Sequence, residues 1–66
     1  MKTLNEIHNL FLAHKYREMV KRIDEYGPVF WTEYNKFLRR LYSVPLNALN
    51  DYTECNIAYN SIKWGD

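Results

Sequence analysis

Cysteine and glycine are scarce in this sequence, and their scarcity excludes several kinds of protein. The chain has one cysteine, Cys55, and two glycines, Gly27 and Gly65, among 66 residues. A single cysteine cannot form an intramolecular disulfide, so the disulfide framework of small secreted domains is excluded and a reducing cytoplasm is the expected location. Two isolated glycines do not form the glycine-rich loop that binds nucleotide phosphates.

Long apolar runs and a strong net charge are also missing. Residues 10–13 form an apolar run that is too short for the core of a signal peptide, and His14 and Lys15 follow it directly. No segment approaches the roughly 18 apolar residues that span a bilayer, so we expect no membrane-bound form. Nine basic and eight acidic residues give a formal net charge of +1, which argues against a global field that steers nucleic acid.

The composition that remains is typical of a small folded domain. Apolar residues make up 47% of the chain and charged residues 26%, with only two prolines, which indicates one globular domain over residues 1–66. A chain of this size buries only about 60% of the surface that it exposes when unfolded. At about 0.05–0.15 kcal/mol per residue, we expect a free energy of unfolding of about 3–10 kcal/mol.

Two apolar stripes in the first third of the chain predict two short helices. Thr3 and Glu6 have the spacing of a helix-capping pair, which predicts a helix from about residue 3 to 13. The stripe of residues 16–25 faces another direction at about 100° per residue, so we predict a second helix there. One continuous, slightly bent helix over residues 3–25 stays open as the alternative. The two stripes consist of Leu4, Ile7 and Phe11, and of Tyr16, Met19, Val20 and Ile23.

The rest of the chain predicts two more helices. The predicted fold class is therefore all-α, a small bundle of three to four short helices. Gly27 suits a C-terminal position with a left-handed backbone, and Pro28 prevents continuation of the second helix. Residues 29–42 have the spacing of a core-facing helix, and Pro45 fits the first turn of a fourth. A short strand near residues 57–61 is the alternative for the last segment. The core stripes consist of Phe30, Tyr34, Phe37 and Leu41, and of Ala48, Tyr52, Cys55, Tyr59 and Ile62.

Residues that could support catalysis or metal binding are few and badly spaced. His8, His14 and Cys55 are the only soft metal-ligand candidates, and no two of them share a helix face by spacing. Cys55 is interpreted as a core residue, and the two histidines as partly exposed helix or turn residues. Asp24 and Asp51 are interpreted as solvated charges. We therefore predict no enzyme, no metal, no cofactor and no small-molecule substrate.

Aromatic residues are abundant, and they indicate a binding surface. Six Tyr, three Phe and two Trp are more than so small a core comfortably encloses, and Tyr and Trp are enriched at interface centres. On the third helix, Trp31, Leu38 and Tyr42 form a second stripe, which predicts docking on another protein or on a second copy of the chain. Coverage of this stripe by the first and fourth helices is the alternative. The predicted partner-binding residues are Trp31, Asn35, Lys36, Leu38, Arg39, Arg40 and Tyr42.

Two local resemblances to helical motifs cover only parts of the chain. Residues 10–19 resemble the hairpin of tetratricopeptide repeats, but Met19 replaces a small residue of that motif and no second copy follows. The segment around Gly27 resembles a helix-turn-helix, but Glu33 and Lys36 fall where that motif buries apolar residues. Neither family is assigned.

The leading functional hypothesis is a small regulator or inhibitor that docks on a larger intracellular protein. Phage proteins directed against their hosts are of this size, which would place the chain in the host cytoplasm. The second hypothesis is a nucleic-acid-binding protein that uses basic residues of the second and third helices. These residues are Arg17, Lys21, Lys36, Arg39 and Arg40.

Overall fold

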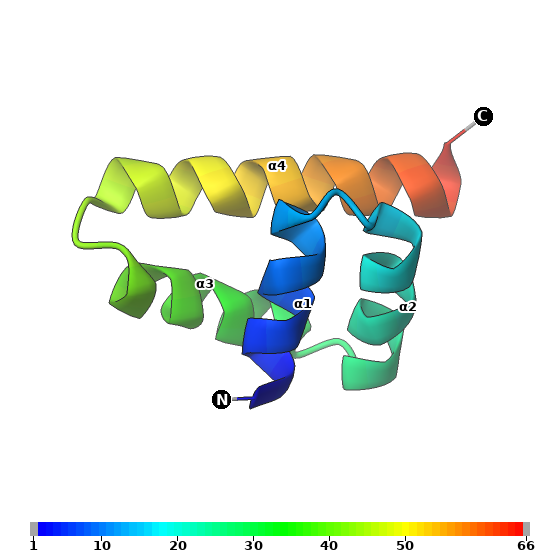
Figure 1. The fold of residues 1–66 in the computed structure, drawn as a ribbon, viewed down its shortest axis with the longest axis horizontal. Helices are drawn as coiled ribbons and strands as arrows, with labels where there is room; N and C mark the ends of the chain where they lie inside the picture. Colours follow the sequence, from blue (N-terminus) through cyan, green and yellow to red (C-terminus); the bar gives the residue numbers. More distant parts are fainter. Residues whose placement is uncertain (1, 66) are drawn as a thin grey trace.

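Four α-helices make up most of residues 2–65, the part of the chain that the computed structural model describes. They are α1 (Lys2–Leu12), α2 (Tyr16–Tyr26), α3 (Phe30–Leu41) and α4 (Pro45–Trp64), and no strand occurs within these residues. In Figure 1, α3 and α4 run antiparallel along the long axis, while α1 and α2 form a second antiparallel pair that crosses them steeply. The predicted all-α bundle of short helices is confirmed.

A tight turn at residues 13–15 separates α1 from α2. His14 has a φ of 61°, which lies in the left-handed region. The Lys15 N–H donates to the carbonyl of Leu10 at 2.9 Å, and the His14 N–H donates to that of Phe11 at 3.0 Å. These two bonds around a residue of positive φ form a Schellman motif, which satisfies carbonyl groups at the helix end. The predicted break is confirmed, and the alternative of one continuous helix is wrong.

Local sequence signals predict the starts of α1 and α4, and the structure agrees with one of them. α1 already begins at Lys2, so Thr3 lies inside the helix and its predicted capping position is wrong. α4 begins at Pro45 as predicted, because the missing amide of proline costs nothing in a first helical turn. α4 continues to Trp64, so the alternative of a strand near residues 57–61 is also wrong.

Gly27 ends α2 with a backbone conformation that glycine alone adopts readily. Its φ is 107° and its ψ is 179°, so the predicted positive φ is confirmed. The ψ places it in the extended region of positive φ, where residues with a Cβ are strained. Its N–H still donates to the carbonyl of Ile23 at 3.2 Å, which closes the last turn of α2.

Replacing Gly27 by alanine is expected to lower the free energy of unfolding by about 1–3 kcal/mol. A Cβ at this position would meet no atom within 4 Å, so the loss comes from backbone strain and not from a clash. Urea unfolding followed by circular dichroism measures it. D-alanine, introduced by chemical synthesis, favours positive φ and should restore most of the loss; equal midpoints for L-alanine and glycine would contradict the assigned conformation.

The hydrophobic core lies where the four helices face one another. The predicted stripes of α1 and α2 are buried there, except for the half-buried Tyr16. On α3 the buried line runs through Leu38, whereas Leu41, which the spacing assigns to the core, is 51% exposed at the end of the helix. Ile62 of α4 was also assigned to the core and is 40% exposed. The buried apolar residues are Leu4, Ile7, Phe11, Met19, Val20, Ile23, Phe30, Tyr34, Leu38, Ala48 and Cys55.

Candidate docking surface

Helix α4 is apolar on two opposite sides. Its inner side packs into the core through Ala48 and Cys55. Its other side has four large apolar side chains that, at about 100° per residue, fall within an arc of about 80°. These four residues, which we call the outer α4 stripe, are Leu46, Leu49, Ile57 and Trp64, with exposed fractions of 62%, 57%, 59% and 72%.

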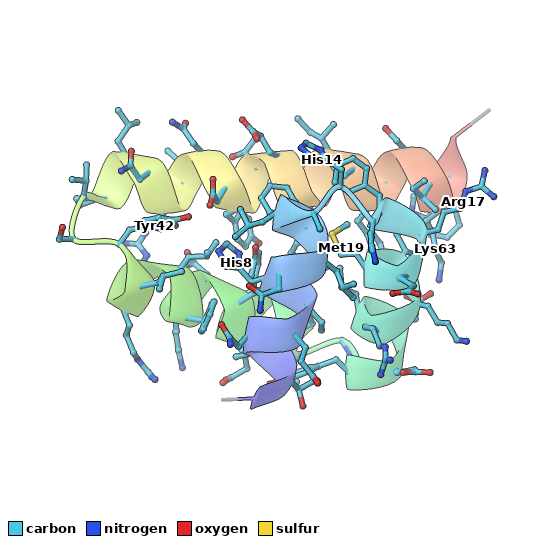
Figure 2. The ribbon with its side chains drawn as sticks, viewed as in Figure 1. His8, His14, Arg17, Met19, Tyr42 and Lys63 are labelled. Atoms are coloured by element: carbon cyan, nitrogen blue, oxygen red, sulfur yellow. The ribbon has the colours of Figure 1, made fainter. Side chains whose placement is uncertain are left out.

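No charged residue interrupts the outer α4 stripe. The remaining positions on this side of the helix are uncharged, and all of them except the half-buried Asn56 are exposed. The nearest charged residues, Glu54 and Lys63, lie at its two edges. Figure 2 shows side chains along the upper edge of α4 that point away from the other helices. The water-facing side of a helix normally has charged residues, so an uncharged apolar stripe of this length is typical of a contact surface. The uncharged positions are Asn50, Thr53, Asn56, Asn60 and Ser61.

Two open hollows lie along the seam between α2 and α4. One, of about 460 Å³, is lined by residues 14–18 and Ile62. The other, of about 350 Å³, is lined by Tyr16, Glu54, Ile57, Ala58, Ser61 and Ile62. Tyr16 and Ile62 line both, so we treat the two hollows as one feature, the Tyr16 groove. Because Ile57 belongs both to this groove and to the outer α4 stripe, the two form one continuous surface.

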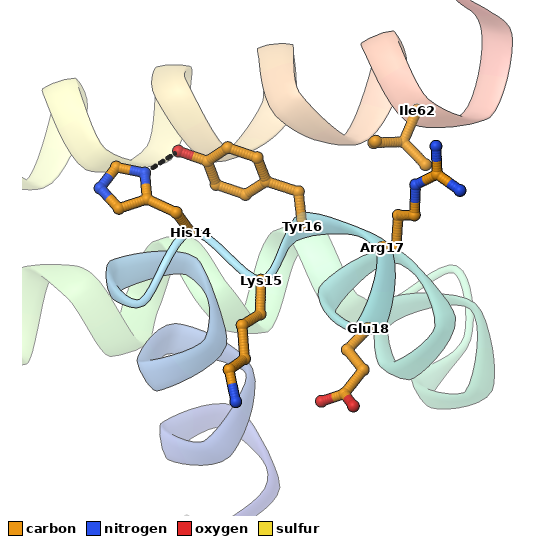
Figure 3. A pocket seen from close by; sticks show the side chains of 6 residues that line it. All are labelled: His14, Lys15, Tyr16, Arg17, Glu18 and Ile62. Carbon is orange, nitrogen blue, oxygen red and sulfur yellow. Dashed lines mark hydrogen bonds between the residues drawn. The ribbon is translucent and has the colours of Figure 1, made fainter.

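The turn between α1 and α2 holds Tyr16 in place in this groove. The Tyr16 hydroxyl lies 2.7 Å from Nδ1 of His14, at hydrogen-bond distance, and the two rings meet edge to face at 5.5 Å. Figure 3 shows this bond, and it shows that the side chains of Lys15 and Glu18 point away from α4. Lys15 and Glu18 therefore form the outer edge of the groove, whereas the side chain of Arg17 points toward Ile62.

The predicted stripe on α3 is largely covered by α4. Leu38 is fully buried, so its assignment to a partner-binding surface is wrong: it belongs to the core. The half-buried Trp31 ring packs edge to face against Tyr52 and Tyr59 of α4, with ring centres 5.6 and 5.5 Å apart. The half-buried Tyr42 donates a hydrogen bond from its hydroxyl to Asp51 of α4, and this bond raises the pKa of Tyr42 to about 12. The fourth helix thus covers this stripe, which is the alternative that the sequence left open.

The polar members of the predicted α3 surface remain at the periphery. Asn35 is half-buried and accepts a hydrogen bond from Nε of Arg39 at 3.3 Å. Lys36, Arg39 and Arg40 are exposed. They lie on α3 and not on α4, so the structure does not bring them into the outer α4 stripe, and their role as an interface rim stays a prediction.

His8 is the functional candidate whose surroundings the sequence analysis missed. It is only 3% exposed, so the interpretation as a partly exposed residue is wrong. Its Nδ1 lies 2.9 Å from the hydroxyl of Tyr34, and the rings of Phe11, Phe37 and Tyr42 surround it at 5.6–6.4 Å. Figure 2 labels His8 on α1 and Tyr42 at the end of α3. The position of His8 between Leu4 and Phe11 on one helix face was the signal that could have revealed its burial.

Burial sets the protonation state of His8. Loss of solvent lowers the pKa of His8 from its usual 6.5, and the carboxylate of Asp51 opposes this shift only in part. Its Nε2 is buried and has no hydrogen-bond partner among the side chains of the described residues. An ionised imidazole would be poorly accommodated here, so His8 supports the fold as a neutral ring and is closed to a substrate.

Cys55 is an unreactive core residue, as the sequence predicts. It is fully buried, and its Sγ lies 3.7 Å from Sδ of Met19. Burial raises the pKa of the Cys55 thiol to about 12. The thiol therefore stays protonated and is a poor nucleophile.

Asp24 connects α2 to the end of α4. Its carboxylate accepts hydrogen bonds from Nζ of Lys63 at 2.5 Å and from the hydroxyl of Tyr59 at 2.7 Å. The bond from Lys63 is the main reason that the pKa of Asp24 is lowered. Asp24 is exposed, as the sequence predicts for a solvated charge, but it also bridges two helices.

Within residues 2–65, no three His, Cys, Asp or Glu side chains are grouped so that they could hold a metal ion. No helix in the same range combines the length and the apolar composition needed to cross a membrane. No protein-family model, curated protein or solved structure matches the chain.

Proposed function

We propose that this chain is a small protein-binding module that docks on a partner protein through the outer α4 stripe and the adjoining Tyr16 groove. The observation that supports the proposal is the uncharged apolar side of α4, with four large side chains more than half exposed. Burying such side chains gains about 25 cal/mol per Å² of apolar surface, which favours a protein contact over exposure to water. The partner surface must therefore be apolar and long enough to follow the helix.

The edges of this surface favour a protein over a polyanion. Basic Lys15 and Arg17 lie beside acidic Glu18 at one end of the groove, and Glu54 lies at the other. Mixed charge around an apolar centre is the usual pattern of protein interfaces. A chain of 66 residues can cover a site on a larger intracellular protein, so regulation or inhibition is the form of activity that we propose.

Replacing Ile57 by aspartate is expected to reduce partner capture at least about tenfold, because a charge at the centre of an apolar interface is costly to desolvate. The experiment is a pull-down with the tagged chain from a lysate of its cell of origin, quantified by mass spectrometry. Leu41→Asp is the matched control, since Leu41 is exposed to a similar degree, 51%, but lies on α3. One stoichiometric protein should be retained by the control and lost by Ile57→Asp.

Two results would contradict the proposal. Equal capture by Ile57→Asp and Leu41→Asp would mean that the outer α4 stripe does not bind the partner. Captured material that disappears with nuclease or with high salt, and that depends on Arg39 and Arg40 instead, would support the nucleic-acid hypothesis.

A further inference from the structure

A small pocket lies among the end of α2, the start of α3 and the last part of α4. Its volume is about 230 Å³. That is below the roughly 300–1,000 Å³ of pockets that hold drug-sized ligands, so it has room for a single side chain of another molecule. It shares no lining residue with the Tyr16 groove. The residues that line this pocket, which we call the Trp31 pocket, are Ile23, Asp24, Gly27, Pro28, Trp31 and Tyr59.

Two aromatic rings form walls of the Trp31 pocket. The rings of Trp31 and Tyr59 meet at an angle of 83°, with their centres 5.5 Å apart. The faces of such rings carry partial negative charge and attract cations that come within about 6 Å of the ring centre. Gly27 forms another part of the wall, and because a Cβ there would meet no atom within 4 Å, no side chain of this molecule fills the space beside it.

Among the residues that line the Trp31 pocket, Asp24 alone is charged, and its charge is negative. The hydroxyl of Tyr59 donates to Oδ1 of Asp24 at 2.7 Å, which holds the carboxylate next to that ring. Each oxygen of a carboxylate has two lone pairs, so an oxygen that already accepts one hydrogen bond can accept another. The carboxylate and the aromatic rings are both complementary to a positive charge.

The chain's own Lys63 shows which kind of cation this arrangement holds. Nζ of Lys63 lies 2.5 Å from Oδ2 of Asp24 and 5.8 Å from the centre of the Tyr59 ring. Lys63 does not line the Trp31 pocket, so its ammonium group binds the carboxylate from outside and leaves the pocket open. An ammonium group placed inside the pocket would meet the same carboxylate and the same ring, and the ring of Trp31 as well.

We infer that the Trp31 pocket binds the ammonium group of a lysine side chain from another protein, in competition with Lys63 for Asp24. The inference goes beyond the proposed function, because it assigns a contact outside the outer α4 stripe and does not depend on what covers that stripe. Arginine is less suitable, since its favoured pairing uses both oxygens of a carboxylate, and each oxygen of Asp24 already accepts a bond. A calcium or magnesium ion needs several oxygen ligands, whereas the lining supplies one carboxylate.

Titration of the chain with Nα-acetyl-lysine amide at constant ionic strength, followed by the NMR signals of the Trp31 indole, tests the inference. A Trp64→Phe background leaves Trp31 as the only tryptophan, so the signals are assigned without ambiguity. They should shift and saturate with a Kd of about 1–10 mM, as expected for one side chain that makes a cation–π contact and an exposed ion pair.

The matched probe is the same compound acetylated on Nζ, which keeps the aliphatic chain and loses the charge. It should bind about three- to thirtyfold more weakly, because the cation–π contact and the ion pair are both lost. Equal affinities for the two compounds would mean that the pocket recognises only the aliphatic chain, and an indole signal that does not shift would mean that it binds neither. Both results would overturn the inference.

Two substitutions should change the affinity for the lysine compound in opposite directions. Asp24→Asn removes the charge but keeps an oxygen for the Tyr59 hydroxyl, and it should weaken binding about two- to fivefold, the effect of an exposed ion pair. Lys63→Gln removes the competing ammonium group and should strengthen binding by a similar factor. The controls are Glu25→Gln and Lys36→Gln, which make the same changes in net charge at exposed positions outside the pocket lining. Substitutions that act no differently from their controls would overturn the role of Asp24.

Failure of this inference and failure of the proposed function give different results. Ile57 does not line the Trp31 pocket, so Ile57→Asp should bind the lysine compound as the wild-type chain does, whether or not it loses its partner. In the pull-down, Asp24→Asn should lower partner capture and Glu25→Gln should not. Capture that Asp24→Asn leaves unchanged would overturn the assignment of the pocket to a lysine of that partner, and it would leave docking on the outer α4 stripe intact.

Discussion

Replacing Phe30 by alanine is expected to remove between about a third and all of the free energy of unfolding at about 25 °C. Phe30 is fully buried, and its ring contacts those of Tyr26, Trp31 and Tyr34, with centres 5.7, 4.8 and 5.0 Å apart. Removing a buried phenylalanine ring costs about 3–5 kcal/mol, because apolar contacts are lost and a cavity remains. A chain of this size has only about 3–10 kcal/mol of stability in total.

The measurement for Phe30→Ala is the helical circular dichroism signal during urea unfolding. Leu41→Ala is the control, since Leu41 is 51% exposed at the end of α3 and its loss should cost no more than about 0.5 kcal/mol. The residue spacing alone assigns both positions to the core, so the comparison also tests the burial that distinguishes them. Similar urea midpoints for the two variants would contradict the packing of α3.

Acidification from about pH 7 to pH 5 is expected to destabilise the fold through His8. Burial lowers the pKa of His8 in the folded chain, whereas the unfolded chain keeps a value near 6.5. Below that pH the unfolded chain binds the proton more readily, so the free energy of unfolding falls as the pH falls. Above that pH, His8 is neutral in both states, so it does not change the free energy of unfolding. The slope is at most about 1.4 kcal/mol per pH unit, which is large for so small a chain.

Urea unfolding at several pH values, with matched histidine variants, isolates this effect. His8→Gln should flatten the dependence between pH 7 and about pH 5, because glutamine does not titrate, while its side-chain oxygen can still accept a hydrogen bond from Tyr34. His14→Gln is the control, because it removes a histidine from the exposed turn and leaves His8 in place. Asp24, whose pKa is lowered from 3.8, loses its stabilising effect only below that pH. It therefore does not contribute to the change in stability between pH 7 and about pH 5. Identical profiles for both variants would rule out His8 as the origin.

The helices α1 and α2 were the part of the fold most fully predicted from the sequence. Their apolar stripes point in different directions, and a helix can bury only one stripe against one neighbour, so the break between them follows from the spacing. The cap that makes the break was not predicted. It places His14, a residue with a Cβ, at a positive φ, whereas the sequence rule expects glycine or asparagine there.

The candidate site was mostly not predicted, and α3 and α4 show why. On α3, two overlapping stripes have the same helical spacing, and only the position of α4 shows that Leu38 is buried and Leu41 exposed. On α4, apolar residues on both sides cancel the directional signal that distinguishes a core side from a water side. The line through Ala48 and Cys55 was recognised as core, and the line through Leu46 and Trp64 was passed over.

The spacing of residues along the chain was enough to predict the helical class, the four segments and most of the residues that α1 and α2 bury. The sequence also showed that glycine-rich nucleotide loops and disulfide frameworks are missing. The packing of the four helices was needed to show which side of α3 and of α4 faces inward, and that aromatic rings enclose His8. Those outcomes depend on how one helix covers another, a property of the packed bundle that the spacing within a single helix does not contain.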